Sequence, residues 1–97
     1  MMTGAEPQRE AWRLRVKGRV QGVGFRYFTF RRAEELGVKG WVRNLPNGEV
    51  EIHAEADRPT LTRFLAAVQQ GPPFSAVEDV ELQKFPVQGH ETFSIKG

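Results

Sequence analysis

Strict alternation of apolar and polar residues marks the strands of this chain. Residues 12–17 read W-R-L-R-V-K, which puts every apolar side chain on one face of a strand. Residues 49–56 read E-V-E-I-H-A-E-A, so the glutamates and the histidine lie opposite the aliphatic side chains, and we interpret their face as solvated. Another strand is predicted over residues 38–45. The P-N-G turn at residues 46–48 joins these two strands as a hairpin, because Asn-Gly tolerates positive φ.

Two other segments carry the spacing of amphipathic helices. The first begins near Phe25 and ends at Gly37, which suits a left-handed C-cap. The second begins after Asp57, a good N-cap, and ends at Gly71, because the Pro-Pro pair that follows prevents continuation. The residues expected on the inner faces of these helices are Phe25, Phe28, Thr29, Ala33, Leu36, Leu61, Phe64, Leu65 and Val68.

The remaining apolar residues complete an α+β fold. Val80 and Leu82 predict a fourth strand, and Phe93 with Ile95 leave room for a short fifth strand at one edge. The order β-α-β-β-α-β is that of the ferredoxin-like, split βαβ sandwich, in which a four-stranded antiparallel sheet carries two helices on one face. In this plan the first and second strands run the same way with the third between them. Their carboxyl ends are therefore about 10 Å apart at the same edge of the sheet.

Composition limits the class of protein and its partners. The 97 residues suit one domain, and we expect residues 1–10 to form a flexible tail and residues 11–97 the domain. The absence of cysteine excludes disulfides and thiolate chemistry. A formal net charge of +2 suits a small anionic substrate better than nucleic acid, which favours a dense basic stripe. Because the chain has no membrane-spanning run and no secretion signal, we expect a cytoplasmic protein that does not bind membranes. The modest charge disfavours nucleic acid as a partner, and a monomer is the simplest expectation.

Residues 18–26, which read G-R-V-Q-G-V-G-F-R, carry the strongest functional signal. Gly22 and Gly24 let the backbone curl so that successive amide N–H groups point inward, and the helix beginning at Phe25 adds its positive end. Arg26 lies in the first turn of this helix, where its forked guanidinium can complete a cradle for a phosphoryl group. The competing interpretation is a tight connection that needs glycine for geometry alone, with Arg26 as a surface residue. Gln21 either offers its side-chain amide to the cradle or faces solvent.

Asn44 is the second candidate, because it lies near the end of the strand whose carboxyl end should face the glycine loop. Its carboxamide can both donate a hydrogen bond to a water molecule and accept one from it. Asparagine beside a turn is also common for conformational reasons alone, so both interpretations are open at this point. Trp41, earlier in the same strand, is most simply a residue that belongs to the core or covers one face of the sheet.

The other side chains with catalytic potential lack partners in the sequence. His53 and His90 are the two histidines, far apart in the chain and without the spacing of a metal site. Ser75 and Ser94 have no base that the sequence can assign to them. We therefore expect no metal, no cofactor and no nucleophilic triad.

Motifs in the first half of the chain closely resemble those of acylphosphatases. The run G-R-V-Q-G-V-G-F-R is followed, after one helix, by G-V-K-G-W-V-R-N and then by N-G-E-V, and the resemblance extends from about Trp12 to Ile95. It implies a small ferredoxin-like enzyme that hydrolyses carboxyl-phosphate mixed anhydrides without a metal. It also implies that Arg26 and Asn44 are the essential arginine and asparagine. The phosphate loop implied by the resemblance comprises Gln21, Gly22, Val23, Gly24, Phe25 and Arg26.

The reaction expected from this resemblance is an in-line attack of water, positioned by Asn44, on an acyl phosphate held by the 21–26 loop and Arg26. Inorganic phosphate is then both a product and a competitive ligand. Family members vary at the positions of Gly24 and Leu45, so these two residues leave the substrate preference open.

Two other functions remain as alternatives. One is a ferredoxin-like RNA-binding module, which needs exposed aromatic residues on the two central strands. The other is an acylphosphatase-like domain that handles carbamoyl phosphate within a larger enzyme. We favour a free-standing enzyme, because the chain ends soon after its last predicted strand and no cysteine-rich segment follows.

Overall fold

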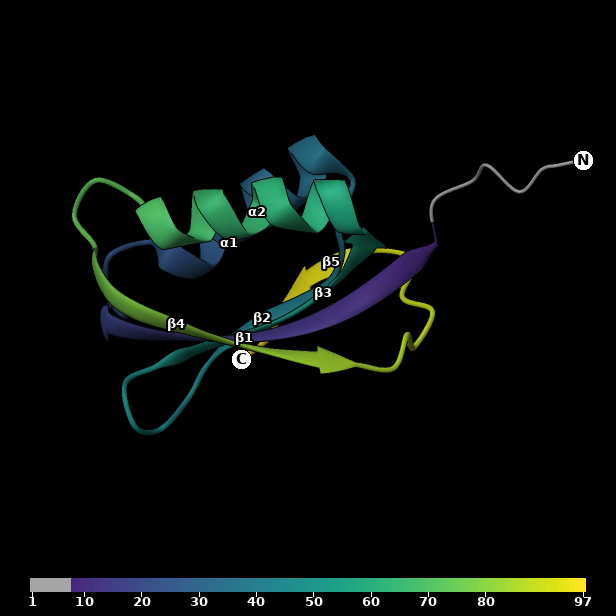
Figure 1. Cartoon of the computed structure of the whole chain (residues 1–97). Helices are drawn as coiled ribbons and strands as arrows, with labels where there is room; N and C mark the ends of the chain where they lie inside the picture. Colours follow the sequence, from purple (N-terminus) through teal and green to yellow (C-terminus); the bar gives the residue numbers. More distant parts are fainter. Residues whose placement is uncertain (1–7) are drawn as a thin grey trace, which may run out of the picture.

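The computed structural model describes residues 8–97, which form one sheet covered on one face by two helices (Figure 1). Along the chain the elements are β1 (Arg9–Arg19), α1 (Phe25–Leu36), β2 (Lys39–Asn44), β3 (Val50–Asp57), α2 (Arg58–Gln70), β4 (Ala76–Phe85) and β5 (Phe93–Ile95). This is the predicted ferredoxin-like α+β fold. The first strand starts earlier than expected: Arg9 and Glu10, assigned to the tail, pair with Asp57 and Ala56 of β3. Of the other residues assigned to the tail, 1–7 lie outside the described residues.

The sheet has the strand order β4-β1-β3-β2-β5. Both β1 and β2 pair antiparallel with β3, so they run in the same direction with β3 between them, as predicted. The fifth edge strand is present, and β5 pairs with β2 in parallel, which makes the five-stranded sheet mixed rather than purely antiparallel. The carboxyl ends of β1, β2 and β5 consequently reach the same side of the molecule.

Gly18, the first residue of the glycine-rich motif, has a role in the sheet. The register between β1 and β4 shifts between Lys17 and Gly18, and Gly18 has φ +123°. A Cβ on Gly18 would lie 2.1 Å from the carbonyl oxygen of Ala76, so the close pairing of β1 with β4 requires glycine here.

Both helices begin and end where the sequence predicts. The carboxylate of Asp57 accepts a hydrogen bond of 2.9 Å from the backbone N–H of Thr60 and caps α2, while Gly37 and Gly71 end α1 and α2. The inner face of α1 is narrower than expected, because Phe28 and Leu36 are only half-buried. Buried aliphatic and aromatic residues from the sheet and both helices form one core, and its largest fully buried apolar side chains are Phe25, Phe64, Leu14, Ile52 and Leu61.

The prediction that the outer face of β3 is solvated is wrong for two of its residues. His53 and Glu55 are both 0 % exposed. The segment that follows β4 covers them, and its backbone N–H groups at Gln88, Gly89 and His90 donate to the Glu55 carboxylate. Sequence alternation assigns a residue to a face of the strand but does not indicate what covers that face, and here a long connection does.

Candidate active site

A hollow of about 260 Å³ opens where the loop after β1, the beginning of α1 and the end of β2 meet. It brings together Arg26 of α1 and Asn44 of β2, as the order of the elements predicts. Tyr27 and Ile95, which were not among the predicted site residues, also reach it. The complete lining is Val20, Gly22, Gly24, Phe25, Arg26, Tyr27, Asn44 and Ile95.

The loop between β1 and α1 depends on left-handed backbone at two glycines. Gly22 has φ +73° and Gly24 has φ +79°. A Cβ on either residue would meet no atom within 4 Å, so glycine is needed here for its backbone conformation and not for lack of space. Val23, between them, packs its side chain against the core and can offer only its backbone to a ligand.

The N-terminus of α1 is suited to binding an anion. Gly24 is the N-cap residue and supplies no side-chain cap, and the first turn contains no acidic residue. Arg26 instead adds a positive charge close to the positive end of the helix dipole, an unfavourable arrangement worth roughly 0.3–1 kcal/mol that a bound anion would reverse. Of the lining residues, Arg26 is the cation.

The C-terminal segment holds the Arg26 side chain. Its Nη1 donates to the backbone carbonyl of Lys96 across 3.2 Å, and the N–H of Lys96 donates to the carbonyl of Val42 at 2.8 Å. The guanidinium is thus connected to β2, the strand that carries Asn44. The sequence carries no signal for this contact, because it joins a side chain to a backbone atom 70 positions away.

Asn44 ends β2 opposite Val50 of β3 and is half-buried. Its neighbour Arg43 is exposed and pairs with Glu51 at 2.6 Å, so it does not line the hollow. Among residues 8–97, the Asn44 carboxamide makes no side-chain hydrogen bond. Its donor and acceptor are therefore available to a ligand or a water molecule in the hollow.

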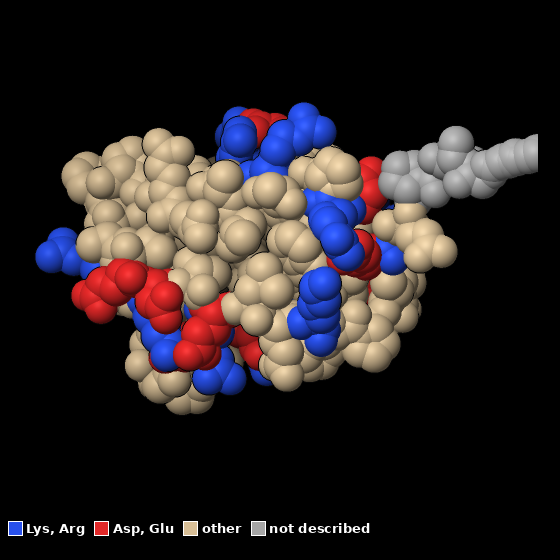
Figure 2. Space-filling model, viewed as in Figure 1, with Lys and Arg blue, Asp and Glu red and all other residues tan. Residues whose placement is uncertain are grey.

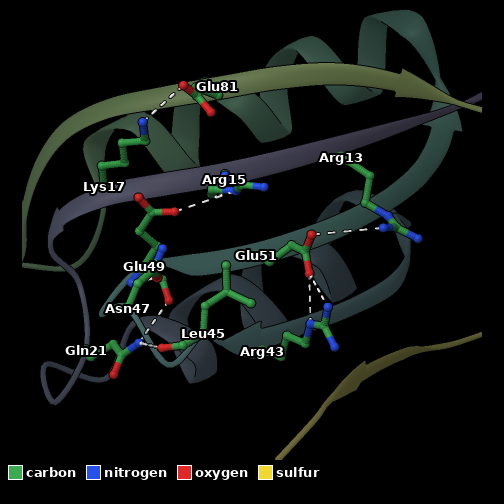
Figure 3. A network of polar contacts seen from close by, with 10 residues as sticks. All are labelled: Arg13, Arg15, Lys17, Gln21, Arg43, Leu45, Asn47, Glu49, Glu51 and Glu81. Carbon is green, nitrogen blue, oxygen red and sulfur yellow. Dashed lines mark hydrogen bonds and ion pairs between the residues drawn. The ribbon is translucent and has the colours of Figure 1, made fainter.

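Gln21 bridges the loop to the β2–β3 hairpin, a role that the sequence did not reveal. Its Nε2 donates to the carbonyl of Leu45 at 2.8 Å and to that of Glu49 at 2.9 Å (Figure 3). The side chain thus neither lines the hollow nor faces solvent, and its backbone is what it can offer to a phosphoryl group. These two bonds fix the loop against the turn that follows Asn44.

Four basic residues of β1 and β2 pair with glutamates on the face of the sheet away from the helices (Figure 3). The pairs are Arg13–Glu51, Arg15–Glu49, Lys17–Glu81 and Arg43–Glu51. On the side of the molecule in Figure 2, blue and red residues likewise lie next to one another and form no stripe of one sign. Pairs this exposed add little stability, but they neutralise the charges that a long polyanion would need.

The two histidines, which the sequence left without partners, lie together. Their ring centroids are 5.2 Å apart, and one possible metal-binding atom each from His53, Glu55 and His90 lie within 4.8 Å of one another. Both nitrogens of the His53 ring are occupied, however: Nδ1 accepts from Arg13 at 2.7 Å, and Nε2 donates to Glu55 at 2.8 Å. A metal ion would have to displace these hydrogen bonds, so we interpret the cluster as an internal hydrogen-bond network. None of the three residues lines the hollow.

Burial and hydrogen bonding set the charge states in this network. Burial lowers the pKa of His53 although the hydrogen bond to Glu55 opposes the shift. Burial by itself would raise the pKa of Glu55. The hydrogen bonds from His53 and from the N–H groups of Gln88 and His90 together bring that pKa below its ordinary value. The network therefore holds an ionised carboxylate beside a neutral imidazole near neutral pH.

A small α+β sandwich in which a glycine loop, an arginine and an asparagine from a second strand line one hollow has the residue types expected of a phosphoryl-binding protein. The family profile described as acylphosphatase matches residues 12–95, the same span as the resemblance found in the sequence. The chain belongs to the acylphosphatase family, and it is an enzyme of the hydrolase class. Among the described residues, no helix is long and apolar enough to cross a membrane.

Relatives of similar length support this assignment. An acylphosphatase of Thermotoga maritima is 52 % identical over 87 residues, which cover 90 % of this chain and 97 % of the relative. The crystal structure of an acylphosphatase from Bacillus subtilis superimposes with a TM-score of 0.89 at 44 % identity, covering 91 % of this chain and 99 % of that one. Full-length HypF, solved in its phosphate- and nucleotide-bound form, contains a similar region with a TM-score of 0.86 and 28 % identity, which covers 98 % of this chain but 13 % of HypF.

Proposed function

We propose that this chain hydrolyses acyl phosphates to a carboxylate and inorganic phosphate, without a metal ion. The observation that carries the proposal is that Arg26 and Asn44, from different elements, line the same hollow at the uncapped N-terminus of α1. Membership of the acylphosphatase family supports the same reaction.

The 21–26 loop and Arg26 bind the phosphoryl group in this proposal. Backbone N–H groups of the loop and the guanidinium of Arg26 donate to the non-bridging oxygens, where charge is spread in the transition state. The contact with Lys96 orients the guanidinium before the substrate arrives, so that less conformational freedom is lost on binding. Gln21 assists through the position of the loop, because its side-chain amide is used by Leu45 and Glu49.

Asn44 positions the attacking water in this proposal. Its carboxamide can accept a hydrogen bond from the water and direct it at phosphorus, in line with the leaving group. The oxygen–phosphorus bond to the acyl group breaks as the bond to water forms, and the water's protons end on phosphate. The leaving carboxylate is the base of an acid with pKa of about 4, so it departs without a general acid.

Phosphate release from benzoyl phosphate in the presence of a chelator tests this function. We expect turnover of benzoyl phosphate, little turnover of the monoester p-nitrophenyl phosphate, and competitive inhibition by inorganic phosphate. A strict requirement for added metal, or a preference for the monoester, would overturn the proposal. We also propose that the protein acts as a monomer with a small-molecule substrate and needs no cofactor; sedimentation analysis of the purified chain tests its monomeric state.

The alternative of an RNA-binding module has less support. The outer positions of β1 and β3 carry arginines, glutamates and the buried His53. Trp41 on β2 is 6 % exposed and contacts Arg13, Arg43 and Lys96 through its ring, so it offers no free surface for base stacking. The carbamoyl phosphate alternative is tested by adding carbamoyl phosphate to the same assay.

A further inference from the structure

The hollow that contains Arg26 and Asn44 has an apolar rim. Five large apolar side chains are exposed in the described part of the chain, namely Tyr27, Phe74, Leu82, Val87 and Ile95. Tyr27 and Ile95, 58 % and 42 % exposed, line this hollow, and the other three do not. Two other lining residues, Val20 and Phe25, are each 1 % exposed and therefore offer a ligand almost no surface. Accessible apolar surface at the hollow thus comes chiefly from Tyr27 and Ile95.

Neighbouring side chains hold the ring of Tyr27 in place. It stacks on Phe30 with the ring centroids 6.4 Å apart and an interplanar angle of 25°, and the guanidinium of Arg31 lies 5.9 Å from its centre. An exposed aromatic ring that already contacts its neighbours loses less conformational freedom when a ligand packs against it than a ring without such contacts.

Ile95 is fixed relative to the phosphoryl-binding residues. It pairs with Val42 across the parallel β2–β5 ladder, and the next residue, Lys96, accepts the hydrogen bond from Arg26. Tyr27 directly follows Arg26 in the first turn of α1. Both apolar side chains line the same hollow as Arg26, whose guanidinium binds the phosphoryl group in the proposed reaction.

We propose that Tyr27 and Ile95 form the subsite for the acyl group and make the enzyme selective for aromatic or branched apolar acyl phosphates. This inference rests on the proposed function. The phosphoryl group occupies the polar part of the hollow, between the loop, Arg26 and Asn44, and the acyl group attached to it packs on the apolar rim. Because a polar cradle gives an apolar group no favourable contact, selectivity arises from the rim.

The decisive measurement is the ratio of kcat/KM for benzoyl phosphate to that for acetyl phosphate. In Tyr27→Ser and in Ile95→Thr we expect this ratio to fall by roughly three- to tenfold, mainly through a higher KM for benzoyl phosphate. In Tyr27→Phe, which keeps the ring, the ratio should stay close to that of the unmodified chain. Benzoate and acetate differ as leaving groups, so the ratio in the unmodified chain does not measure selectivity for the acyl group by itself. The change in the ratio between variants does, because the leaving groups stay the same.

Phe74→Ser is the matched control, since Phe74 is 80 % exposed and does not line the hollow. It should leave the ratio unchanged. The inference is overturned if the Tyr27→Ser and Ile95→Thr variants remain folded and active but keep the original ratio. A ratio that falls equally in Phe74→Ser would also overturn it, since the effect would not belong to the rim.

A binding measurement separates this inference from the proposed reaction. Calorimetric titration with benzylphosphonate and with methylphosphonate requires no turnover. Benzylphosphonate should bind more tightly than methylphosphonate, and this difference should be lost in Tyr27→Ser. Such a result supports the apolar subsite even if neither acyl phosphate is hydrolysed. In that case only the proposed reaction is refuted. Equal affinity for both phosphonates, together with turnover of benzoyl phosphate, would leave the reaction standing and refute the subsite.

Discussion

Arg26 of α1 donates a hydrogen bond to the backbone carbonyl of Lys96 across 3.2 Å, although 70 positions separate the two residues. The same residue, Lys96, donates its N–H to Val42 of β2. One residue beyond the last strand therefore links the guanidinium to the strand that carries Asn44. Since a carbonyl from the backbone makes this link, the identity of the side chain at position 96 should matter little to it.

Removing residues 96 and 97 should therefore impair the site, whereas Lys96→Ala should not. The truncation removes the acceptor for Arg26, and the freed guanidinium must then be ordered on each binding event. We expect about a three- to tenfold loss in kcat/KM for benzoyl phosphate. The Lys96→Ala control keeps the carbonyl and loses the contact of Nζ with the Trp41 ring, 4.5 Å away. Equal losses in both variants would contradict the backbone role.

Arg26→Ala should lower both the affinity for phosphate and the turnover, because the guanidinium contacts the phosphoryl oxygens before and during the reaction in our proposal. Loss of one donor to a transition-state oxyanion costs on the order of 10²–10³ in rate. Steady-state kinetics and calorimetric titration of inorganic phosphate measure the two effects. Arg63→Ala, an exposed arginine of α2 outside the hollow, serves as the control. Unaltered phosphate affinity in Arg26→Ala would remove Arg26 from the binding site.

Asn44→Ala should lower kcat by roughly 10²-fold while the affinity for inorganic phosphate changes little, since Asn44 is proposed to bind the water and not the substrate. The chain offers a matched control in Asn47, whose carboxamide accepts from the N–H of Glu49 at 3.0 Å within the β2–β3 turn. Asn47→Ala should affect stability more than rate. A normal kcat in Asn44→Ala would refute the water-positioning role.

Gln21→Leu should destabilise the fold by about 1–2 kcal/mol, because two backbone carbonyls lose the donor that joins the loop to the hairpin. Urea unfolding measures this change, with Gln69→Leu on the exposed face of α2 as the control. We expect a smaller loss of activity than in Arg26→Ala. If phosphate affinity falls sharply while stability is unchanged, the Gln21 side chain contacts the substrate directly.

The buried network around His53 should make stability depend on pH. Because burial lowers the pKa of His53 below its ordinary value of about 6.5, the unfolded chain binds a proton more readily, and stability falls as pH decreases below that value. Glu55 acts in the same direction at lower pH: its pKa also lies below the ordinary value, so its contribution is present above about pH 4.5 and is lost on further acidification.

Unfolding free energies measured in urea between pH 5 and 8 test this prediction. The unmodified chain should be less stable at pH 5 than at pH 8, and His53→Gln should show a shallower slope between pH 5 and 7. An equally steep slope in His53→Gln would mean that another group titrates.

Local features of this protein follow from its sequence, because their causes lie within a few residues. Alternation predicts the strands, Asp57 and Gly71 delimit α2, and left-handed backbone at Gly22 and Gly24 forms the loop. The order of the elements adds one long-range result, since it places the end of β2 beside the loop and so brings Asn44 to Arg26. That result follows from the topology of the sheet, which determines the order and direction of the strands.

Only the tertiary structure decided which side chains meet and what covers each face. The burial of His53 and Glu55 depends on the segment after β4, and the parallel pairing of β5 places Ile95 at the hollow and the carbonyl of Lys96 within hydrogen-bond distance of Arg26. The order of the elements brings the loop that carries Gln21 close to the β2–β3 hairpin. It does not determine that the Gln21 side chain donates to the carbonyls of Leu45 and Glu49. Residue periodicity shows which side chains of a helix or strand lie on its apolar face and which lie on its polar face. Which segment covers each face depends on packing between parts of the chain that are distant in sequence. Such packing produces no periodic pattern from which it could be predicted.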